Sequence, residues 1–280
     1  MTKYLPLIIV AILLTTLFTT TPSYAEKAAT AGDKTAKKDS TGNSAKTDNS
    51  KEKDDITLEE ILENYYEAVG GLKSWSNINT IKFSGIMRSM GTKIKADAVY
   101  KRPNQCRLDF RLKNIHMIES YDGTTPWTKN PLLGITKPVE LKGDQAMKIL
   151  KTCEFDAPLI NHKEKGHELE YLGVEDVDGR KAYVIKIDHK IDDGETYFID
   201  ADTFLPFMVQ GTTDINGVSK IVITLVDNYI ETRDIVIPYH YEFAVEDSKG
   251  VEILDIKSVE LNSEVDESIF LMPRNSKDSY

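Results

Sequence analysis

The chain has 280 residues, 40% of them apolar, and a formal net charge of −10 at pH 7. A surface this acidic repels phosphate backbones and anionic head groups, so nucleic acid is not expected as a partner. Only two cysteines are present, which excludes a disulfide-rich scaffold, while the apolar content is enough for one sizeable core. The composition therefore indicates one globular domain, which we expect to be a monomer.

Residues 1–25 have the pattern of a secretory signal peptide. Lys3 gives a positive start, an apolar run covers residues 5–18, and Pro22 and Ala25 supply a helix breaker and the small residue of a cleavage site. The run is shorter than the ~20 residues that a membrane span needs. We expect a periplasmic protein that is soluble after cleavage, with an uncleaved inner-membrane anchor as the alternative. Cleavage removes one lysine, so the mature chain would carry −11.

Residues 26–55 lack any large apolar side chain, and we expect this segment to be a disordered linker. It would serve either as a tether or as a solvated tail. Residues 56–273 are predicted to form one folded domain, and residues 274–280 a short tail.

An amphipathic helix is predicted at the start of the domain. Thr57 and Glu60 have the spacing of a capping box, and Gly70-Gly71 is a stop signal. Between them apolar residues recur at the helical spacing, namely Leu58, Ile61, Leu62, Tyr65 and Val69, with Leu72 as the next position of the stripe.

From Ile78 onward the apolar period changes to two, which is typical of β-strands. Asp122-Gly123 and Asp178-Gly179 are among the hairpin signals that separate the strands. The pattern predicts about ten or eleven strands in sequential hairpins, forming a large antiparallel sheet that is either curled or closed into a barrel. The fold class expected is mainly β with flanking helices.

Residues 130–165 interrupt this pattern with three prolines and two short helical stretches. Asp144 is placed to cap the first stretch and Asp156 the second. We expect this insertion to act as a helical lid over the concave apolar face of the sheet, beside the N-terminal helix.

No catalytic or metal-binding motif is found in the sequence, so we expect neither an enzyme nor a cofactor. His162 and His167 lie in a polar stretch without metal-ligand spacing, and we interpret both as surface residues. Cys106 falls on the apolar face of a strand and Cys153 on the apolar face of a helix. They form either two buried thiols or one disulfide, which would lock the insertion to the sheet and make its opening redox-dependent.

Candidate cavity-lining residues are apolar side chains of the strands and of the insertion, because methionine and aromatic side chains suit adaptable apolar sites. Each could equally be ordinary core. The candidates are Phe83, Met87, Leu108, Phe110, Trp127, Leu132, Leu133, Met147, Leu150, Tyr239 and Tyr241.

Several motifs in order resemble the LolA/LolB-like lipoprotein-sorting proteins. They are YYEAVGGLKSW (65–75), IKFSG (81–85), RLDF (107–110), YDGTTPWTKNPLLG (121–134), LGVEDVDGRKAYVIKI (172–187), YFIDADTFLP (197–206) and NSEVDESIFLMP (262–273). The resemblance implies a strongly curved, incomplete antiparallel β-barrel with helices that plug its mouth.

The resemblance also implies a function, which is to hold acyl chains in an apolar cavity without catalysis and without a cofactor. The expected partners are a lipidated protein or lipid acyl chains. The alternative is a sensor or regulatory module of the RseB type, which would bind another envelope protein. The lipid anchor and the membrane-inserting loop of the LolB type are not found in this sequence.

Overall fold

The structure is a computed structural model that describes residues 56–189, 194–215 and 217–273. The predictions for the signal peptide, the linker and the C-terminal tail therefore fall outside the described residues. Within the described ranges, no helix has the length and apolar character required to cross a bilayer.

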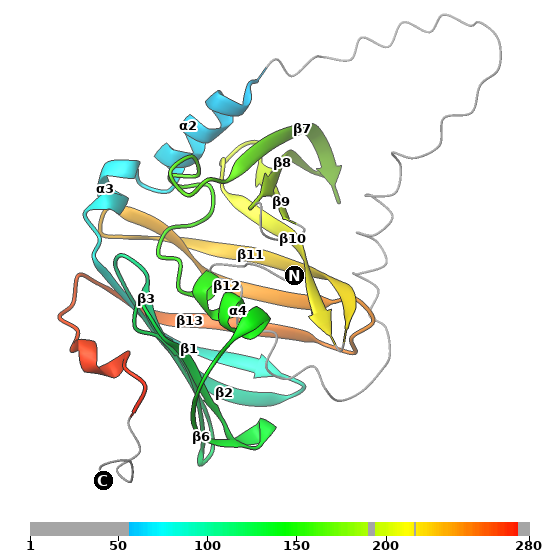
Figure 1. Cartoon of the computed structure of the whole chain (residues 1–280). Helices are drawn as coiled ribbons and strands as arrows, with labels where there is room; N and C mark the ends of the chain where they lie inside the picture. The colour runs from blue at the N-terminus through cyan, green and yellow to red at the C-terminus, as the bar shows by residue number, and fades with distance from the viewer. Residues whose placement is uncertain (1–55, 190–193, 216, 274–280) are drawn as a thin grey trace, which may run out of the picture.

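One antiparallel sheet of thirteen strands contains most of the described chain (Figure 1). Its strands are β1 (Thr80–Ser89), β2 (Thr92–Lys101), β3 (Gln105–Leu112), β4 (Ile115–Tyr121), β5 (Pro126–Asn130), β6 (Ile135–Glu140), β7 (Glu168–Val177), β8 (Arg180–Asp188), β9 (Glu195–Asp200), β10 (Pro206–Ile215), β11 (Val218–Thr232), β12 (Ile235–Val245) and β13 (Val251–Leu261). The helices are α2 (Leu58–Ala68), α3 (Leu72–Ser76) and α4 (Gly143–Thr152), with the 3-10 turns η2 (Pro131–Leu133) and η3 (Glu267–Ile269).

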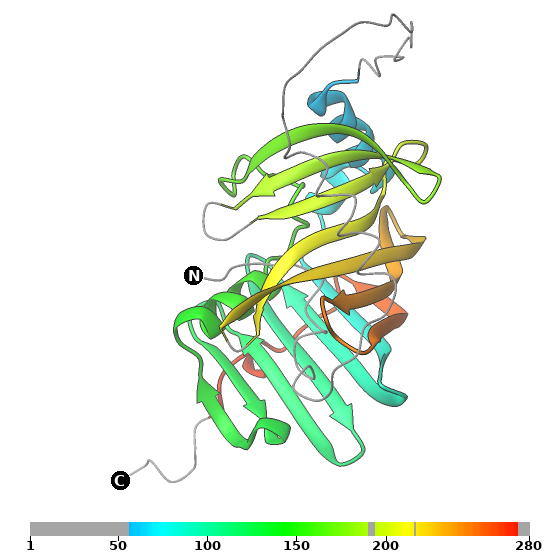
Figure 2. The same cartoon turned by 90° about the vertical axis from the view of Figure 1, so that its right-hand side faces the viewer.

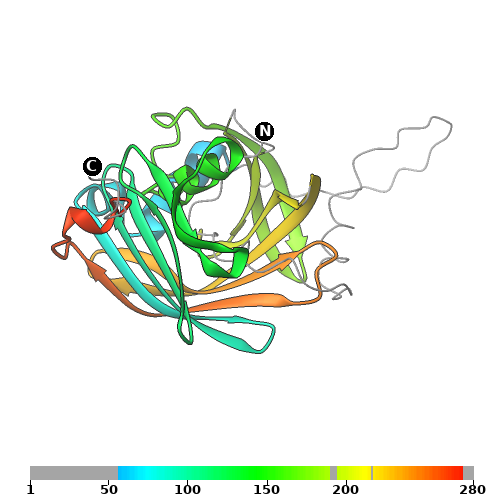
Figure 3. The same cartoon turned by 60° about the horizontal axis from the view of Figure 1, so that its bottom comes forward.

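Neighbouring strands of the sheet are consecutive in the chain, except where β1 pairs with β13. The sheet order is therefore β6 to β1 followed by β13 to β7, which leaves β6 and β7 as unpaired edges. Figure 2 shows the two ends of the sheet on opposite sides of the long strands β10 to β13, and Figure 3 shows the sheet curving around α4. The predicted curved and unclosed antiparallel sheet is thus confirmed.

The number of strands differs from the expected ten or eleven. The main reason is β6, a short edge strand that contains Pro138 and lies inside the predicted helical insertion. Proline is tolerated there because one side of an edge strand needs no ladder partner.

The pairing of β1 with β13 contains a bulge next to Gly85. A Cβ atom at Gly85 would lie only 2.6 Å from the carbonyl oxygen of Asp255 on β13. Glycine is therefore required for the close approach of the two backbones at this joint.

The main hydrophobic core lies on the concave face of the sheet. Residues paired across antiparallel strands share a face, so the register places Cys106 opposite Tyr121, and Phe110 opposite Met117, on the concave side. The same core includes side chains of α2 and Ile149 of α4. A smaller cluster, centred on Val184 and Phe198, lies on the opposite face of the sheet.

The predicted N-terminal helix is confirmed as α2. Thr57 and Glu60 form both hydrogen bonds of the capping box, and Ile61, Leu62 and Tyr65 are buried. The helix ends before Gly70, whose φ is +99° and whose missing side chain allows contact with the backbone of Asp234. Leu72 does not continue the stripe, because it begins the separate helix α3 and is exposed.

The insertion differs from its prediction in two ways. Its first helix, α4, begins at Gly143 with Lys142 as the N-cap, so Asp144 lies in the first turn. The second predicted helix is replaced by turns around Leu159 and Ile160. Asp156 does not cap a helix, because its two carboxylate oxygens accept hydrogen bonds from the guanidinium of Arg102 at 2.7 and 2.6 Å.

Replacing Gly85 with alanine should lower the free energy of unfolding by about 1–3 kcal/mol, because the new methyl group overlaps the backbone of β13. Denaturant unfolding followed by fluorescence measures the change. Gly250→Ala is the matched control, because a Cβ there meets nothing within 4 Å. Equal stabilities for the two variants would contradict the close packing of this joint.

Candidate functional site

A small apolar cavity lies on the concave face where β1 and β13 join the two halves of the sheet. Its volume is about 50 Å³. Its lining comes from both halves, namely Phe83, Ala96, Asp97, Ala98, Tyr100, Leu108, Phe110, Tyr241, Leu254 and Ile256. Ligand pockets usually measure about 300–1,000 Å³, so a long ligand would require the surrounding side chains or the lid to move.

Small side chains on β2 leave the space that forms the cavity. Ala96 and Ala98 occupy successive concave positions, opposite Phe110 and Leu108 on β3. The aromatic wall is built by Phe83 and Tyr100, whose rings meet edge to face with centroids 6.0 Å apart. The cavity is thus formed where large side chains surround a pair of alanines.

The structure brings some of the predicted candidates together at this cavity and not others. Phe83, Leu108, Phe110 and Tyr241 line it. Met87 is fully buried in the core and does not reach the lining. The ligand-binding role of these side chains stays a prediction.

Three candidates on or near α4 and β12 also lie outside the lining. Met147 is half-buried on α4, and Leu150 packs from the same helix against the main core. The hydroxyl group of Tyr239 lies 3.1 Å from that of Thr232. Leu150 and Tyr239 pack against the main core, and none of the three residues lines the cavity.

Trp127, Leu132 and Leu133 are placed differently from the prediction. Trp127 is fully buried on the convex face, where its indole N–H donates to the carbonyl oxygen of Phe270 at 2.7 Å. Leu132 and Leu133 lie in the turn η2 with 40% and 56% of their surface exposed. Trp127 is buried on the convex side because the C-terminal segment around Phe270 covers β3 to β5 there. No local pattern in the sequence predicts that this segment packs against these strands.

Six lining residues were not predicted from the sequence, namely Ala96, Asp97, Ala98, Tyr100, Leu254 and Ile256. The alternation of apolar residues in IKADAVY (94–100) does predict that Ala96, Ala98 and Tyr100 share one face of β2. Nothing local indicates that β13 lies next to β1, so the contribution of Leu254 and Ile256 could not be found.

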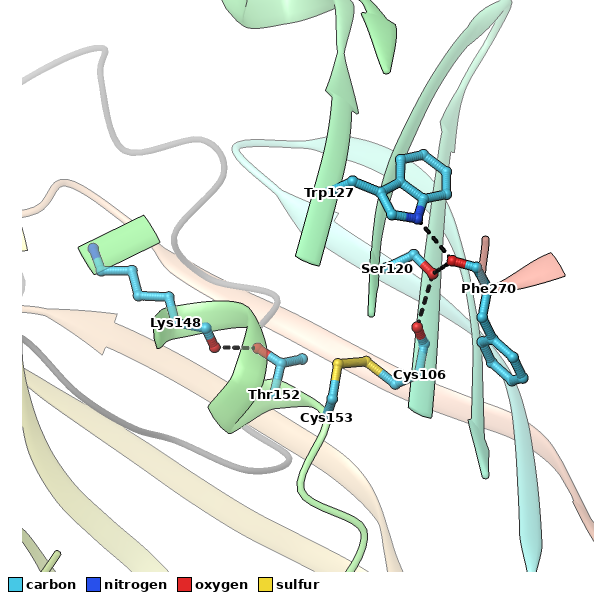
Figure 4. Close-up of a disulfide and its surroundings, with 7 residues drawn as sticks. All are labelled: Cys106, Ser120, Trp127, Lys148, Thr152, Cys153 and Phe270. Carbon is cyan, nitrogen blue, oxygen red and sulfur yellow. Dashed lines mark hydrogen bonds between the residues drawn. A yellow bond between two sulfur atoms is a disulfide. The ribbon is translucent and has the colours of Figure 1, made fainter. Parts of the chain in front are cut away.

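The two cysteines are joined in a disulfide that fastens α4 to the concave face of β3 (Figure 4). Their Cα atoms are 5.0 Å apart, within the usual range for disulfides. On the opposite face, the hydroxyl of Ser120 lies 2.9 Å from the carbonyl oxygen of Cys106 and 3.1 Å from that of Phe270. The strand that bears Cys106 is therefore fixed from both sides.

Two charged contacts also hold the insertion in place. The Nζ atom of Lys151, at the end of α4, lies 3.6 Å from Oε1 of Glu195 on β9, and both side chains are almost completely buried. After α4, Asp156 binds Arg102, which also donates to the carbonyl oxygens of Trp75 and Ile78. The lid is thus tied to both halves of the sheet.

The two histidines interpreted as surface residues are half-buried. The Nδ1 atom of His162 lies 3.4 Å from the hydroxyl of Tyr66, and the ring of His167 meets that of His189 edge to face at 4.5 Å. Burial lowers the pKa of both residues. Within the described ranges, no three or more His, Cys, Asp or Glu side chains are grouped so as to hold a metal ion.

Two carboxyl groups on the concave face have raised pKa values because burial disfavours their charged form. Glu252 on β13 accepts a hydrogen bond from Ser89 at 2.8 Å, and burial raises its pKa to about 7. Burial also raises the pKa of Glu119 on β4 to about 7, although the charge of Lys148 on α4 acts in the opposite direction.

Comparison with known proteins identifies the fold. No family model and no curated protein matches the sequence. A LolA superfamily protein from Nitrosomonas europaea has a TM-score of 0.51 at 14% identity, covering 77% of this chain and 98% of that one. A DUF1329 family protein from Desulfovibrio piger has a TM-score of 0.53 at 10% identity, covering 76% of this chain and 97% of the other.

A domain from Vibrio parahaemolyticus that is named for outer-membrane lipoprotein sorting is also similar. Its TM-score is 0.51 at 12% identity, with coverage of 75% of this chain and 94% of that one. The chain therefore has a LolA-like fold, as the sequence resemblance implied.

Removing the disulfide by the double substitution Cys106→Ser and Cys153→Ser should lower the free energy of unfolding by about 4 kcal/mol in the chain-entropy model, because it opens a loop with a sequence separation of 47. Hydrogen exchange should also become faster in α4 than in β8 to β10. The oxidised protein treated with a thiol-blocking reagent is the control. Two titratable thiols in the unfolded, unreduced protein would contradict the bond.

Stability should fall as the pH rises from about 4.5 to above 7, because folding keeps a proton on Glu252 that the unfolded chain loses near its usual pKa of 4.5. The contribution of Glu252 is about 3 kcal/mol, fully present below pH 4.5 and lost above the raised pKa. Glu252→Gln should flatten this part of the profile. Glu260→Gln on the same strand is the exposed control, and the same slope in both variants would contradict the assignment.

Proposed function

We propose that this protein is an envelope carrier or binding protein that holds acyl chains on the concave face of its sheet. The observation that carries the proposal is the apolar cavity at the joint of β1 and β13, lined by aromatic and aliphatic side chains beneath a helix-covered concave face. Apolar lining of this kind suits a hydrocarbon chain, which needs no hydrogen-bond partner.

The fold and the sequence support the same function. The sequence motifs resemble lipoprotein-sorting proteins, and the solved structures with this fold include a LolA superfamily protein. The signal-peptide pattern of residues 1–25 agrees with a periplasmic location. The favoured ligands are accordingly the acyl chains of a lipid or of a lipidated protein.

The cavity must enlarge if it is to take up a long chain. Its volume of about 50 Å³ is far below that of a usual ligand pocket. The element able to move is α4, which covers β4 and β5. Because the disulfide holds the C-terminal end of α4 on β3, opening would begin at the N-terminal end of the helix, near Gly143.

Native mass spectrometry with organic extraction, on protein purified from the periplasm without detergent, should find bound acyl species. Ala98→Leu fills the space at the cavity, because Ala98 belongs to the lining, and should weaken uptake of a fluorescent fatty-acyl probe by about tenfold or more. Ala68→Leu, at the end of α2 and outside the lining, is the matched control.

An empty protein that also fails to take up the probe would contradict the carrier function. Capture of a specific envelope protein by the same lipid-free preparation would then favour a regulatory binding module.

A further inference from the structure

Two tyrosine side chains contribute to the lining of the apolar cavity. Tyr100 comes from β2 and Tyr241 from β12, so each half of the sheet supplies one of them. Both residues are buried, with 9% and 3% of their surface exposed. Asp97 is the third polar residue of the lining, but its carboxylate accepts hydrogen bonds from Ser84 at 2.5 Å and from Arg111 at 2.7 Å. Its polar atoms are therefore already engaged.

The hydroxyl groups of Tyr100 and Tyr241 have no hydrogen-bond partner among the described residues. A buried tyrosine hydroxyl usually has one; that of Tyr121, for example, donates to the carbonyl oxygen of Gly123 at 2.8 Å. Within the described ranges, the polar side-chain atoms that are both sealed from solvent and unpartnered lie on other residues. The two hydroxyls are therefore unpaired without being sealed, and the open space beside both side chains is the cavity that they line.

The two tyrosine rings are held in place by other aromatic side chains. Tyr100 meets Phe83 edge to face with centroids 6.0 Å apart, and Tyr241 stacks on Phe243 with centroids 6.1 Å apart. Burial raises the pKa of both hydroxyls, so they stay protonated at neutral pH and can donate hydrogen bonds. The cavity thus offers two fixed hydroxyl donors in apolar surroundings.

A neutral carbonyl oxygen is the acceptor that suits these donors best. It has two lone pairs and can accept from both hydroxyls. The lining residues of the described chain include no lysine, arginine or histidine, so an ionised carboxylate would lose its water without gaining a counter-ion. A plain hydrocarbon would leave both hydroxyls unpaired. The chemistry of the lining therefore favours an acyl ester over a free acid.

We propose that Tyr100 and Tyr241 bind the ester carbonyl of an acyl ligand, so that the cavity selects neutral acyl esters. Both hydroxyls donate to the carbonyl oxygen, and the chain lies along the apolar concave face once α4 has moved. This inference rests on the proposed acyl-binding function and specifies its ligand class. Such esters occur on free lipids and on lipidated proteins, and the contact that recognises them is the same in both.

The test compares three ligands with chains of matched length, namely methyl decanoate, the decanoate ion, and decyl methyl sulfide, whose thioether is only a weak acceptor. Each competes with a fluorescent fatty-acyl probe on the protein purified from the periplasm, at pH 8 and below the solubility limit of the ligand. The ester should bind about tenfold more tightly than the sulfide, the usual effect of two neutral hydrogen bonds. It should also bind more tightly than the ion.

Removing one hydroxyl at a time separates the hydroxyls from the rings. Tyr100→Phe and Tyr241→Phe should each weaken binding of the ester about threefold and change binding of the sulfide less than twofold. The double variant should bind ester and sulfide equally. All three variants should keep or raise the midpoint of denaturant unfolding, because they remove hydroxyls that are unpaired in the free protein. Tyr121→Phe is the matched control, since it removes a paired hydroxyl outside the lining.

Infrared spectroscopy reads the contact directly. The carbonyl stretch of methyl decanoate labelled with carbon-13 should lie at a lower frequency on the wild-type protein than on the double variant, because hydrogen bonding weakens the carbonyl bond. The same frequency on both proteins would overturn the contact.

Two further probes distinguish the sources of the ester. Monodecanoylglycerol represents a free lipid, and a short peptide whose cysteine carries a decanoylated glyceryl group represents a lipidated protein. The proposal requires the double variant to weaken both. Tighter binding of the lipopeptide to the wild-type protein would support the ester site with a lipidated protein as its source, and tighter binding of the glyceride would support it with a lipid as its source.

The remaining outcomes separate this site from the proposed function. Equal binding of ester and sulfide by the wild-type protein, or tighter binding of the decanoate ion, would overturn the ester site and leave acyl binding intact. A loss in Tyr121→Phe as large as in the cavity variants would also overturn it. Failure of every ligand to bind would overturn the proposed function together with the ester site.

Discussion

The pairing of β1 with β13 is the constraint on which the rest of the structure depends. It is the one strand pair of the described sheet that is not consecutive in the chain, and it joins Ile81 to Leu261. Without it the chain would form two separate meanders, each with an exposed apolar face. The cavity lies across this joint, with Phe83 on one side and Ile256 on the other. The bulge at Gly85 lets the two backbones approach there.

A curved sheet that does not close needs cover for its concave face, because an exposed apolar surface of that size would favour association. Here α2 and α4 cover the concave face, and different interactions hold each helix to the sheet. The side chains of α2 pack into the core. The C-terminal end of α4 is fixed by the disulfide and by the buried pair of Lys151 and Glu195. The N-terminal end of α4 lacks a side-chain cap, so fewer of the contacts described here hold this end of the helix.

Ionisable side chains on the concave face are accommodated in two different ways. Lys151 and Glu195 balance each other, and removing either would leave a buried charge without its counterpart, which is strongly destabilising. Glu119 and Glu252 remain neutral more readily because burial raises their pKa values. Glu252 still has Ser89 as a donor, whereas Glu119 has no such donor among the described residues.

Local patterns in the sequence determined the features that short-range physics controls. The capping box of Thr57 and Glu60 predicted the start of α2, and the Asp178-Gly179 pair predicted the β7–β8 turn, because both depend on neighbouring backbone groups. Period-two alternation predicted the faces of β3. Only the tertiary structure decided that Trp127 lies on the convex side, that Cys106 meets Cys153, and that Leu254 joins Phe83 at the cavity. These features depend on contacts between segments far apart in the chain. Alternation assigns the residues of a strand to two faces, but it does not show which face the rest of the chain will cover.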